Sequence, residues 1–502
     1  MADVVRQAGA RLKGQVQPLL QARFYPGSID NLRRSYLAFH SFDKAHTIAL
    51  AEAGLITHEV ASAILSGLRE MEVEGLEKAR DALGGGRHSG EAYLNSKIGP
   101  DKAGWINMGR SSGDLDAVSW RFNLRQRIPA FLEKLLKLRQ SLVSVAEENV
   151  DTVMPCYSIG QAAQCTSFAH MMLSWEAMFM RDSKRLSDFF DEISASPSGS
   201  AIMTGSTFPI SRKRTAELLG FDSVILNTRD ATVNLDSLLH AHSIVSICIS
   251  NALSVANDMY LWTMPEYRFL DLDDSWCSTS SIMPQKKNSW ALAWIRGQAS
   301  LAIGRLGGVF TLLKMESDGL EDTLLGPWQL YDAMDEAEDM LSMLEGMIGT
   351  MTVNKDRLAE TASHGWTQAT DLAALLTMEA GLPWRDAHQV VAHLVRESVD
   401  AGIDPSEICP DHINEVAGRL LGKTLQLNAE SVRKALDPRA SLRNREVVEG
   451  SPAPSRLKEQ FQILRGQVER DRARMAALAR GRREMEEKLE AAVQAVIDGK
   501  IK

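Results

Sequence analysis

At residues 278–288 the chain reads STSSIMPQKKN. This stretch collects hydroxyl groups, two lysines and a carboxamide within eleven residues. By composition alone it is a polar connector, because loops between helices run over the surface and carry such side chains. The two apolar segments that it joins decide which fold the chain adopts.

The segment before it, residues 237–257, contains no Asp, Glu, Lys or Arg. Its length is that of a membrane span, about 20 residues. It nevertheless carries too many polar groups for a helix that faces lipid: His240, His242, Ser243, Ser246, Ser250, Asn251 and Ser254. An almost uncharged helix of a soluble protein is buried on most sides. We therefore expect this segment at the centre of a helical bundle, one that subunits can share.

The segment after it predicts a second long helix over 290–315. Small residues there allow neighbouring helices to approach closely: Gly297, Ala299, Gly304, Gly307 and Gly308. An amphipathic helix is predicted over Leu132–Val145, with leucines on one face and charges on the other. The tail from about Lys458 is interpreted as a solvated helical hairpin. Strand-like alternation is scarce, so the predicted fold class is all-α.

The chain has 502 residues, too many for one core, since single domains usually stop growing near ~250–300 residues. Its 44% hydrophobic and 24% charged residues exclude a largely disordered chain. The net charge of −9 gives no overall basic field, so we expect no nucleic-acid partner. Five scattered cysteines without a CxxC pair, and twenty initial residues without an apolar core, predict a reducing, cytoplasmic location and no membrane attachment.

Three domains are expected. Residues 1–112 form an N-terminal helical domain, residues 113–364 hold the long helices with the loop at 278–288, and residues 365–502 form a C-terminal helical domain. In the last part the pattern changes to shorter helices, because Gly381 can end one helix and Pro383 can begin the next.

Residues 280–288, SSIMPQKKN, resemble the signature loop of the fumarase/aspartase superfamily, whose pattern is GSSxMPxKxN. Thr279 stands where the pattern has its leading glycine. Further segments are similar to one branch of that superfamily, the argininosuccinate lyases: TGSTFPISR at 204–212, AELLGFD at 216–222, ATDLA at 369–373, GLPWRDAH at 381–388 and DPRAS at 437–441. On these matches the chain is identified as a member of the argininosuccinate lyase family.

The resemblance implies an all-α, three-domain fold with a long central helical bundle that assembles into a 20-helix tetramer core. It implies active sites that draw residues from three chains of this homotetramer. It also implies a β-elimination that splits an N-substituted aspartate into fumarate and an amine, with no metal ion and no cofactor. His240 and His242 are accordingly interpreted as satisfied polar residues of a buried helix, because no carboxylate joins them at metal-ligand spacing.

Within the loop, Ser280 matches the serine that serves the family as base. Its neighbour Ser281 can contact the same substrate carboxylate. Lys286 and Asn288 match the residues that hold the carboxylate of the carbanion, where cationic and hydrogen-bonding groups stabilise developing charge. A serine base needs a depressed pKa, and Lys286 is the candidate for the positive charge that lowers it. Lys287 is interpreted as an ordinary exposed lysine.

Residues 107–114, NMGRSSGD, resemble the family motif HTGRSRND. Ser111 matches its serine, while Ser112 stands in place of an arginine and Gly113 in place of an asparagine that binds substrate. The resemblance implies that Ser111 and Ser112 contact the substrate.

Residues 154–161, MPCYSIGQ, resemble MPGYTHLQ. Ser158 can replace the threonine hydroxyl and Gln161 is retained, so both are expected to bind substrate. Ile159 replaces a histidine associated with acid–base work. The leaving amine would then depart without a proton from that position.

The family's Tyr, Gln and Lys that face the arginine moiety become Met315, Leu320 and Thr323. Leucine cannot replace the lost polar contacts, and an unmatched polar group costs ~1–3 kcal/mol. Argininosuccinate remains the leading substrate. Two alternatives stay open: a paralogue that cleaves another N-substituted aspartate or an aminopolycarboxylate, and a non-catalytic structural relative, against which the intact loop argues.

Overall fold

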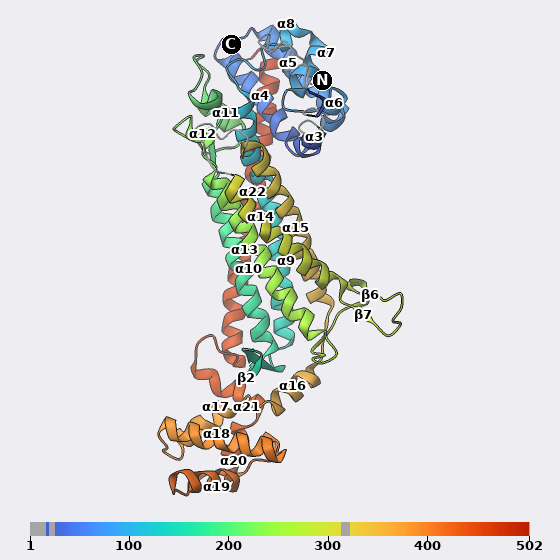
Figure 1. The fold of residues 1–502 in the computed structure, drawn as a ribbon. Helices are drawn as coiled ribbons and strands as arrows, with labels where there is room; N and C mark the ends of the chain where they lie inside the picture. Colours follow the sequence, from blue (N-terminus) through green and yellow to red (C-terminus); the bar gives the residue numbers. More distant parts are fainter. Residues whose placement is uncertain (1–16, 20–25, 313–321, 501–502) are drawn as a thin grey trace.

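The computed structural model describes residues 17–19, 26–312 and 322–500. Figure 1 shows an elongated molecule with a bundle of long helices between two groups of shorter helices. The bundle consists of α9 (Ser112–Glu148), α10 (Phe168–Glu192), α13 (Asp236–Trp262), α14 (Trp290–Leu312), α15 (Asp322–Thr350) and α22 (Pro454–Ile497). The prediction of an all-α fold with a long central bundle is confirmed.

The uncharged segment forms α13, which packs against α10, α14 and α15 in the bundle. Its buried face is mainly apolar, with His242 and Ser246 among the apolar residues, and Trp262 at its end stacks on Trp175 with ring centroids 5.3 Å apart. Over the described residues, one helical stretch, Asp230–Trp262, has the length and composition to cross a membrane. In its most apolar window 56% of the residues are buried inside the protein, as in a core helix.

Both other predicted bundle helices are present. The amphipathic segment lies inside α9, whose leucines join the core shared with α10 and α15. The glycine-containing helix α14 ends at Leu312 as described, and the last residues of the predicted range 290–315 lie outside the described residues.

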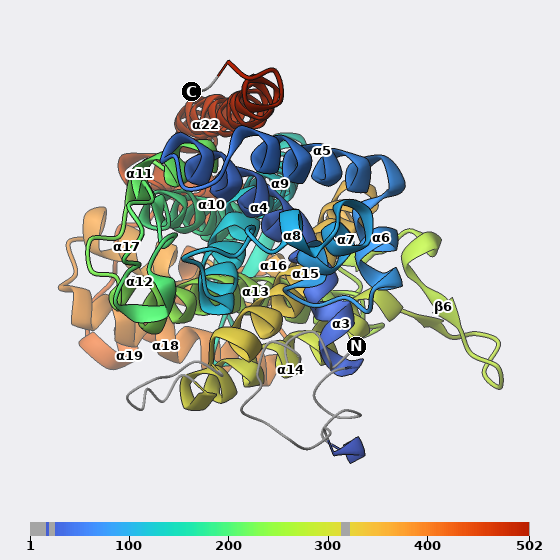
Figure 2. The same cartoon turned by 90° about the horizontal axis from the view of Figure 1, so that it is seen from above.

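A group of short helices covers one end of the bundle (Figure 1, Figure 2). It comprises α3 (Pro26–Arg33), α4 (Tyr36–Glu52), α5 (His58–Glu74), α6 (Leu76–Ala82), α7 (Ser89–Ile98) and α8 (Pro100–Ala103), with α11 (Arg212–Leu218) and α12 (Asp230–Val233) nearby. Their apolar residues form a core of their own, which also contains residues from the far end of α22.

The opposite end carries α16 (Lys355–His364), α17 (Ala369–Met378), α18 (Trp384–Ala401), α19 (Pro410–Leu421), α20 (Ala429–Ala435) and α21 (Pro438–Asn444). Helices α17 to α20 share a separate small core. The predicted break between α17 and α18 is present, because Gly381 adopts φ 67° there and Pro383 precedes α18.

The tail is one continuous helix of 44 residues, α22, and the predicted hairpin was wrong. Leu457, Phe461 and Leu464 join the core of the bundle, and Met485 and Val493 join the N-terminal core. A helix tolerates isolated glycines, so Gly466 and Gly481 do not break it. The helix α22 therefore packs with the bundle and the N-terminal helices and not with the C-terminal group. The domain boundaries near residues 112 and 364 stay predictions.

In the described part of the chain the strands form four two-stranded pairs: β1 (Val153–Ser158) with β2 (Gln161–Ser167), β3 (Ala195–Ser196) with β4 (Ser223–Val224), β5 (Leu270–Asp271) with β8 (Thr352–Val353), and β6 (Ser278–Thr279) with β7 (Lys287–Asn288). Only the β3–β4 pair is parallel. The β1–β2 and β6–β7 hairpins carry residues of the expected site.

Candidate active site

The predicted catalytic loop is an antiparallel hairpin that projects from the side of the bundle (Figure 1, Figure 2). Strands β6 and β7 pair Ser278 with Asn288 and Thr279 with Lys287. Residues 280–286 form its largely exposed tip. The tip includes the apolar residues Ile282 and Met283, which are 81% and 40% exposed, so it is not packed against the helices of its own chain.

The Ser280 hydroxyl oxygen accepts hydrogen bonds from the backbone N–H groups of Ile282 and Met283, at 3.3 and 3.1 Å. Two N–H dipoles directed at one oxygen stabilise negative charge on it. Ser281 is exposed, and its side chain makes no hydrogen bond with another residue in the described part of the chain. Of the two serines, Ser280 therefore has the surroundings that the predicted base requires.

The Lys286 side chain is exposed at the end of the loop, and its backbone N–H donates to the Met283 carbonyl at 3.1 Å. No carboxylate of the described residues pairs with its ammonium group. Asn288 is half-buried at the base of the hairpin. An ammonium group without a protein partner is available to a substrate carboxylate.

Lys287 is not the ordinary exposed lysine that the sequence suggested. Its Nζ donates to Asp271 Oδ1 at 3.0 Å and to the Leu272 carbonyl at 2.6 Å, and it lies 2.8 Å from Asp274 Oδ1. Hydrogen bonds with Asp274 and Asp271 raise the pKa of Lys287. This lysine therefore fastens the base of the hairpin to the segment that precedes it.

Ser111 is the N-cap of α9. Its Oγ accepts from the Gly113 N–H at 3.2 Å, and its own N–H donates to Asp114 Oδ2 at 2.9 Å, which together complete a capping box. Ser112 is the first residue of the helix and is half-buried. Both predicted binding residues thus lie at a helix N-terminus, where backbone N–H groups favour negative charge.

Asp114 was not predicted as a site residue, although the spacing S-x-x-D signals a capping box. It is fully buried and also accepts from Ser200 Oγ at 2.8 Å, Ala201 N at 3.1 Å and Ile202 N at 3.4 Å. Ala201 and Ile202 have φ of 44° and 75°, and a β-branched residue at positive φ is strained. The Asp114 carboxylate holds this turn beside the start of α9.

Ser158 and Gln161 face each other across the two-residue turn of the β1–β2 hairpin. Ile159 and Gly160 form the turn with φ of 50° and 74°, as a hairpin of this kind requires. Ile159 is 100% exposed. The turn therefore exposes two polar side chains and one apolar side chain to solvent.

The structure does not bring these three groups together within one chain. Ser111 and the β1–β2 hairpin lie at opposite ends of α9, whose 37 residues span roughly 55 Å at ~1.5 Å per residue. The β6–β7 hairpin extends sideways from the bundle (Figure 1). No hydrogen bond between described residues joins any two of the three groups.

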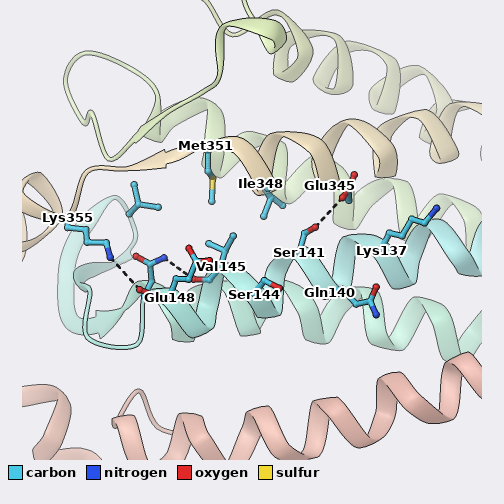
Figure 3. Close-up of a pocket in the computed structure, with 13 residues that line it drawn as sticks. Lys137, Gln140, Ser141, Ser144, Val145, Glu148, Glu345, Ile348, Met351 and Lys355 are labelled. Carbon is cyan, nitrogen blue, oxygen red and sulfur yellow. Dashed lines mark hydrogen bonds between the residues drawn. The ribbon is translucent and has the colours of Figure 1, made fainter.

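A hollow of about 400 Å³ between α9 and α15 lies elsewhere (Figure 3). Ser141 Oγ donates to Glu345 Oε1 at 3.3 Å across it, and Lys355 Nζ donates to the Glu148 carbonyl at 3.4 Å. None of the predicted site residues lines it, and none of its lining side chains holds a buried polar atom without a partner. We interpret it as a solvated groove between two helices.

Across residues 17–19, 26–312 and 322–500, no group of three or more His, Cys, Asp and Glu side chains has the arrangement of a metal site. His240 pairs with Glu192 at 2.7 Å, and His242 Nε2 lies 3.2 Å from the Gly326 carbonyl oxygen. Burial lowers the pKa of His242 to about 4, so it is neutral. Both histidines have protein partners, as expected of polar residues in a packed helix.

Met315 and Leu320 lie outside the described residues, and Thr323 is described only as part of the helix α15.

Two family models match the chain. One described as "Lyase" matches residues 28–304, and one described as "Argininosuccinate lyase C-terminal" matches residues 366–443. The argininosuccinate lyase of Methanosarcina acetivorans is 34% identical over 452 residues, which are 89% of each chain. That of Methanocaldococcus jannaschii is 33% identical over 432 residues, 85% of this chain and 87% of the relative.

Among solved structures, EDDS lyase in complex with formate is similar with a TM-score of 0.87 and 28% identity, and covers 97% of each chain. The 3-carboxy-cis,cis-muconate lactonizing enzyme of Pseudomonas putida is 17% identical, with a TM-score of 0.67 over 91% of this chain and 100% of its own. This second likeness shows the fold alone.

Proposed function

The chain belongs to the argininosuccinate lyase family of the fumarase/aspartase superfamily and is a carbon–nitrogen lyase, and we propose that it splits argininosuccinate into fumarate and arginine. The observation that supports argininosuccinate as the substrate is the similarity, over 89% of the chain, to a relative named argininosuccinate lyase. A part in arginine biosynthesis and a cytoplasmic location belong to the same proposal.

In the proposed reaction Ser280, as an alkoxide, removes a proton from the carbon beside one carboxylate. The electron pair of the broken C–H bond is delocalised into that carboxylate, which gives an aci-carboxylate. When this pair forms the carbon–carbon double bond of fumarate, the C–N bond breaks and its electrons leave with the amine. Ser281, Lys286 and Asn288 would hold the carboxylate on which this charge develops. The two N–H donors on the Ser280 oxygen support its assignment as base.

We propose that Ser111, Ser112, Ser158 and Gln161 bind substrate in a site shared between chains. Support comes from the separation of roughly 55 Å along α9, since no single substrate can reach both ends of one bundle. A site that combines residues from both ends of α9 with the β6–β7 hairpin must therefore be formed by different copies of the chain. An antiparallel arrangement of bundles would bring opposite ends together.

Two bundle helices offer surfaces for such an assembly. Exposed residues of α13 follow helical spacing without a charge: Ile247, Ser250, Ser254, Asn257 and Leu261. On α14 an exposed stripe joins large apolar residues to small ones: Trp290, Ala293, Gly297, Leu301, Gly304 and Gly308. Uncharged stripes of this extent favour association, and we propose a homotetramer.

Mixing of inactive subunits tests the shared site. Ser280→Ala and Gln161→Ala each remove one predicted contribution, and the two variants are unfolded together and refolded. If the residues come from different chains, mixed oligomers regain some sites without either substitution, and activity returns. If both residues serve the same site from one chain, the mixture stays inactive. Light scattering gives the mass, and a monomer at micromolar concentration would contradict the tetramer.

A second substrate class is favoured by the departures at Ser112, Gly113 and Ile159 from the family motifs. A solved structure that covers 97% of the chain carries another substrate name, EDDS. The second candidate function is therefore cleavage of another N-substituted aspartate or aminopolycarboxylate to fumarate and an amine.

The test is the ultraviolet absorbance of fumarate, followed first with argininosuccinate and then with a panel of N-substituted aspartates. Turnover of argininosuccinate at a rate equal to or above that of every other panel member supports the first substrate. Turnover of another member alone establishes the second class, and absence of fumarate from all of them would contradict both.

A further inference from the structure

A partly enclosed hollow of about 140 Å³ lies between α4, the segment before α9 and residues 199–215. Its wall includes Arg110 and Arg212, and none of the residues proposed to act on substrate lines it. The hollow is therefore distinct from the proposed active site, although Arg110 directly precedes Ser111 in the chain.

The Arg110 side chain is only 2% exposed, and its guanidinium packs over the Phe42 ring. Nη2 donates to Asp43 Oδ1 and to Asn107 Oδ1, both at 2.7 Å. Nε and Nη1 are buried and have no acceptor in the described part of the chain. The second oxygen of Asp43 accepts from Arg80 at 3.0 Å, so this carboxylate is shared between two buried arginines.

Arg212 reaches the same hollow from the start of α11. Its Nε donates to the Ser198 carbonyl at 2.7 Å, whereas its Nη2 is buried without an acceptor. No carboxylate of the described residues lies within ion-pair distance of it. Burial lowers the pKa of Arg212, and the Asp114 carboxylate only partly opposes this effect. Asp114 already accepts from three backbone N–H groups and a hydroxyl.

Buried guanidinium N–H groups without acceptors are unfavourable, and guanidinium groups match the oxygens of carboxylates and phosphates. We propose that this hollow binds a small oxyanion, inorganic phosphate or a short carboxylate, between Arg110 and Arg212. The hollow is well below the ~300 Å³ at which pockets for larger organic ligands begin, which excludes a nucleotide.

The walls of the hollow are close because two glycines form them. Gly109 and Gly199 have φ of 70° and 74°, and a Cβ at Gly109 would lie 2.8 Å from Ser206 Oγ. A Cβ at Gly199 would lie 2.7 Å from Arg212 Cγ. Burial and Arg110 lower the pKa of His46, also in the wall, to about 3, so the positive charge of the hollow comes from the arginines.

An anion held by Arg110 would stabilise the segment that ends in the cap of α9. Occupancy is therefore expected to raise thermal stability and to change the KM of a substrate that contacts Ser111 and Ser112. The binding step needs no turnover, so its failure and the failure of the proposed lyase reaction are distinguishable.

The experiment titrates the full-length protein with inorganic phosphate and, separately, with fumarate, at constant ionic strength set with chloride. Calorimetry gives the affinity, and thermal unfolding gives the stabilisation. At least one anion is expected to bind saturably, and Arg212→Gln is expected to weaken it at least tenfold. Lys213→Gln is the matched control, because it removes the same charge from the exposed neighbouring residue and should leave the affinity unchanged.

Lys286→Ala separates this hollow from the proposed catalytic loop and should retain the binding. Saturable binding of phosphate alone, of fumarate alone or of both shows which kind of oxyanion the hollow accepts. No saturable effect beyond chloride, or an affinity retained in Arg212→Gln and lost in Lys286→Ala, would overturn the proposal. If Arg212→Gln does not fold by circular dichroism, Thr228→Val, which removes a hydroxyl from the wall, is expected to weaken binding severalfold, and an unchanged affinity there would also overturn it.

Discussion

The Ser280 hydroxyl oxygen lies 3.1 Å from the Met283 backbone nitrogen, within the tip of a hairpin that stands away from the bundle. The hydrogen bond is local, so the loop orients its serine without help from the rest of the chain. The same N–H groups that fix the side chain also stabilise negative charge on its oxygen.

Replacement Ser280→Ala should lower kcat by roughly a thousandfold or more, because it removes the proposed base, while substrate binding stays largely intact. The measurement is fumarate release together with substrate affinity by calorimetry. Ser281→Ala is the matched control and should lose far less. The reverse order of the two effects would show that the assignment of the serines is wrong.

The two adjacent lysines should behave differently. Lys286→Ala should raise KM and lower kcat, because no carboxylate in the described part of the chain pairs with its ammonium, which leaves that group available to the substrate carboxylate. Lys287→Ala should mainly loosen the hairpin, because it loses contacts with Asp271, Leu272 and Asp274. Limited proteolysis within 280–286 should therefore accelerate in Lys287→Ala alone. Equal protease sensitivity of both variants would contradict these separate roles.

Asp114→Asn should lower the free energy of unfolding by about 2–3 kcal/mol, because an amide nitrogen cannot accept the N–H groups that the carboxylate oxygen accepted. Urea denaturation of both proteins gives the difference. Asp188→Asn is the control, since that carboxylate is exposed and pairs with the exposed Lys184. Its effect should stay within about 0.5 kcal/mol.

His46 should make the protein less stable in acid. Burial and Arg110 lower the pKa of His46 to about 3, whereas an unfolded histidine titrates near 6.5. Below pH ~6.5 the histidine is therefore protonated in the unfolded chain but stays neutral in the folded chain, and the free energy of unfolding decreases as the pH falls towards 3. His46→Gln should remove about 1.4 kcal/mol per pH unit of this slope between pH 6.5 and 5. Urea midpoints of both proteins at pH 5 and 7.5 test it, and parallel slopes would contradict it.

Ile159→His should raise activity no more than a few-fold. An N-substituted aspartate with a basic nitrogen carries its own proton, so the leaving amine needs no acid from this position. The measurement is kcat across N-substituted aspartates of graded amine pKa, for both proteins. A large gain confined to the least basic leaving groups would show that acid assistance limits the reaction.

The amino-acid sequence determined the all-α class, the helices α9, α13 and α14 and the signature loop. Each rests on a local pattern, either the spacing of apolar residues along one helix or a fixed order of residues in one loop. The tail shows the limit of such patterns. Its sparse leucines suggested a hairpin, but they face two different cores along a single helix.

Only the tertiary structure decided how distant segments meet. The Asp114 carboxylate holds the turn at Ser200, although 86 residues separate the two in the chain. Arg110 shares a hollow with Arg212, which lies about a hundred residues further along the chain. The length of α9 keeps Ser111 away from Ser158, although their motifs looked like parts of one site. Periodicity reports which face of a helix is apolar, whereas the contacts of that face depend on how the helices pack.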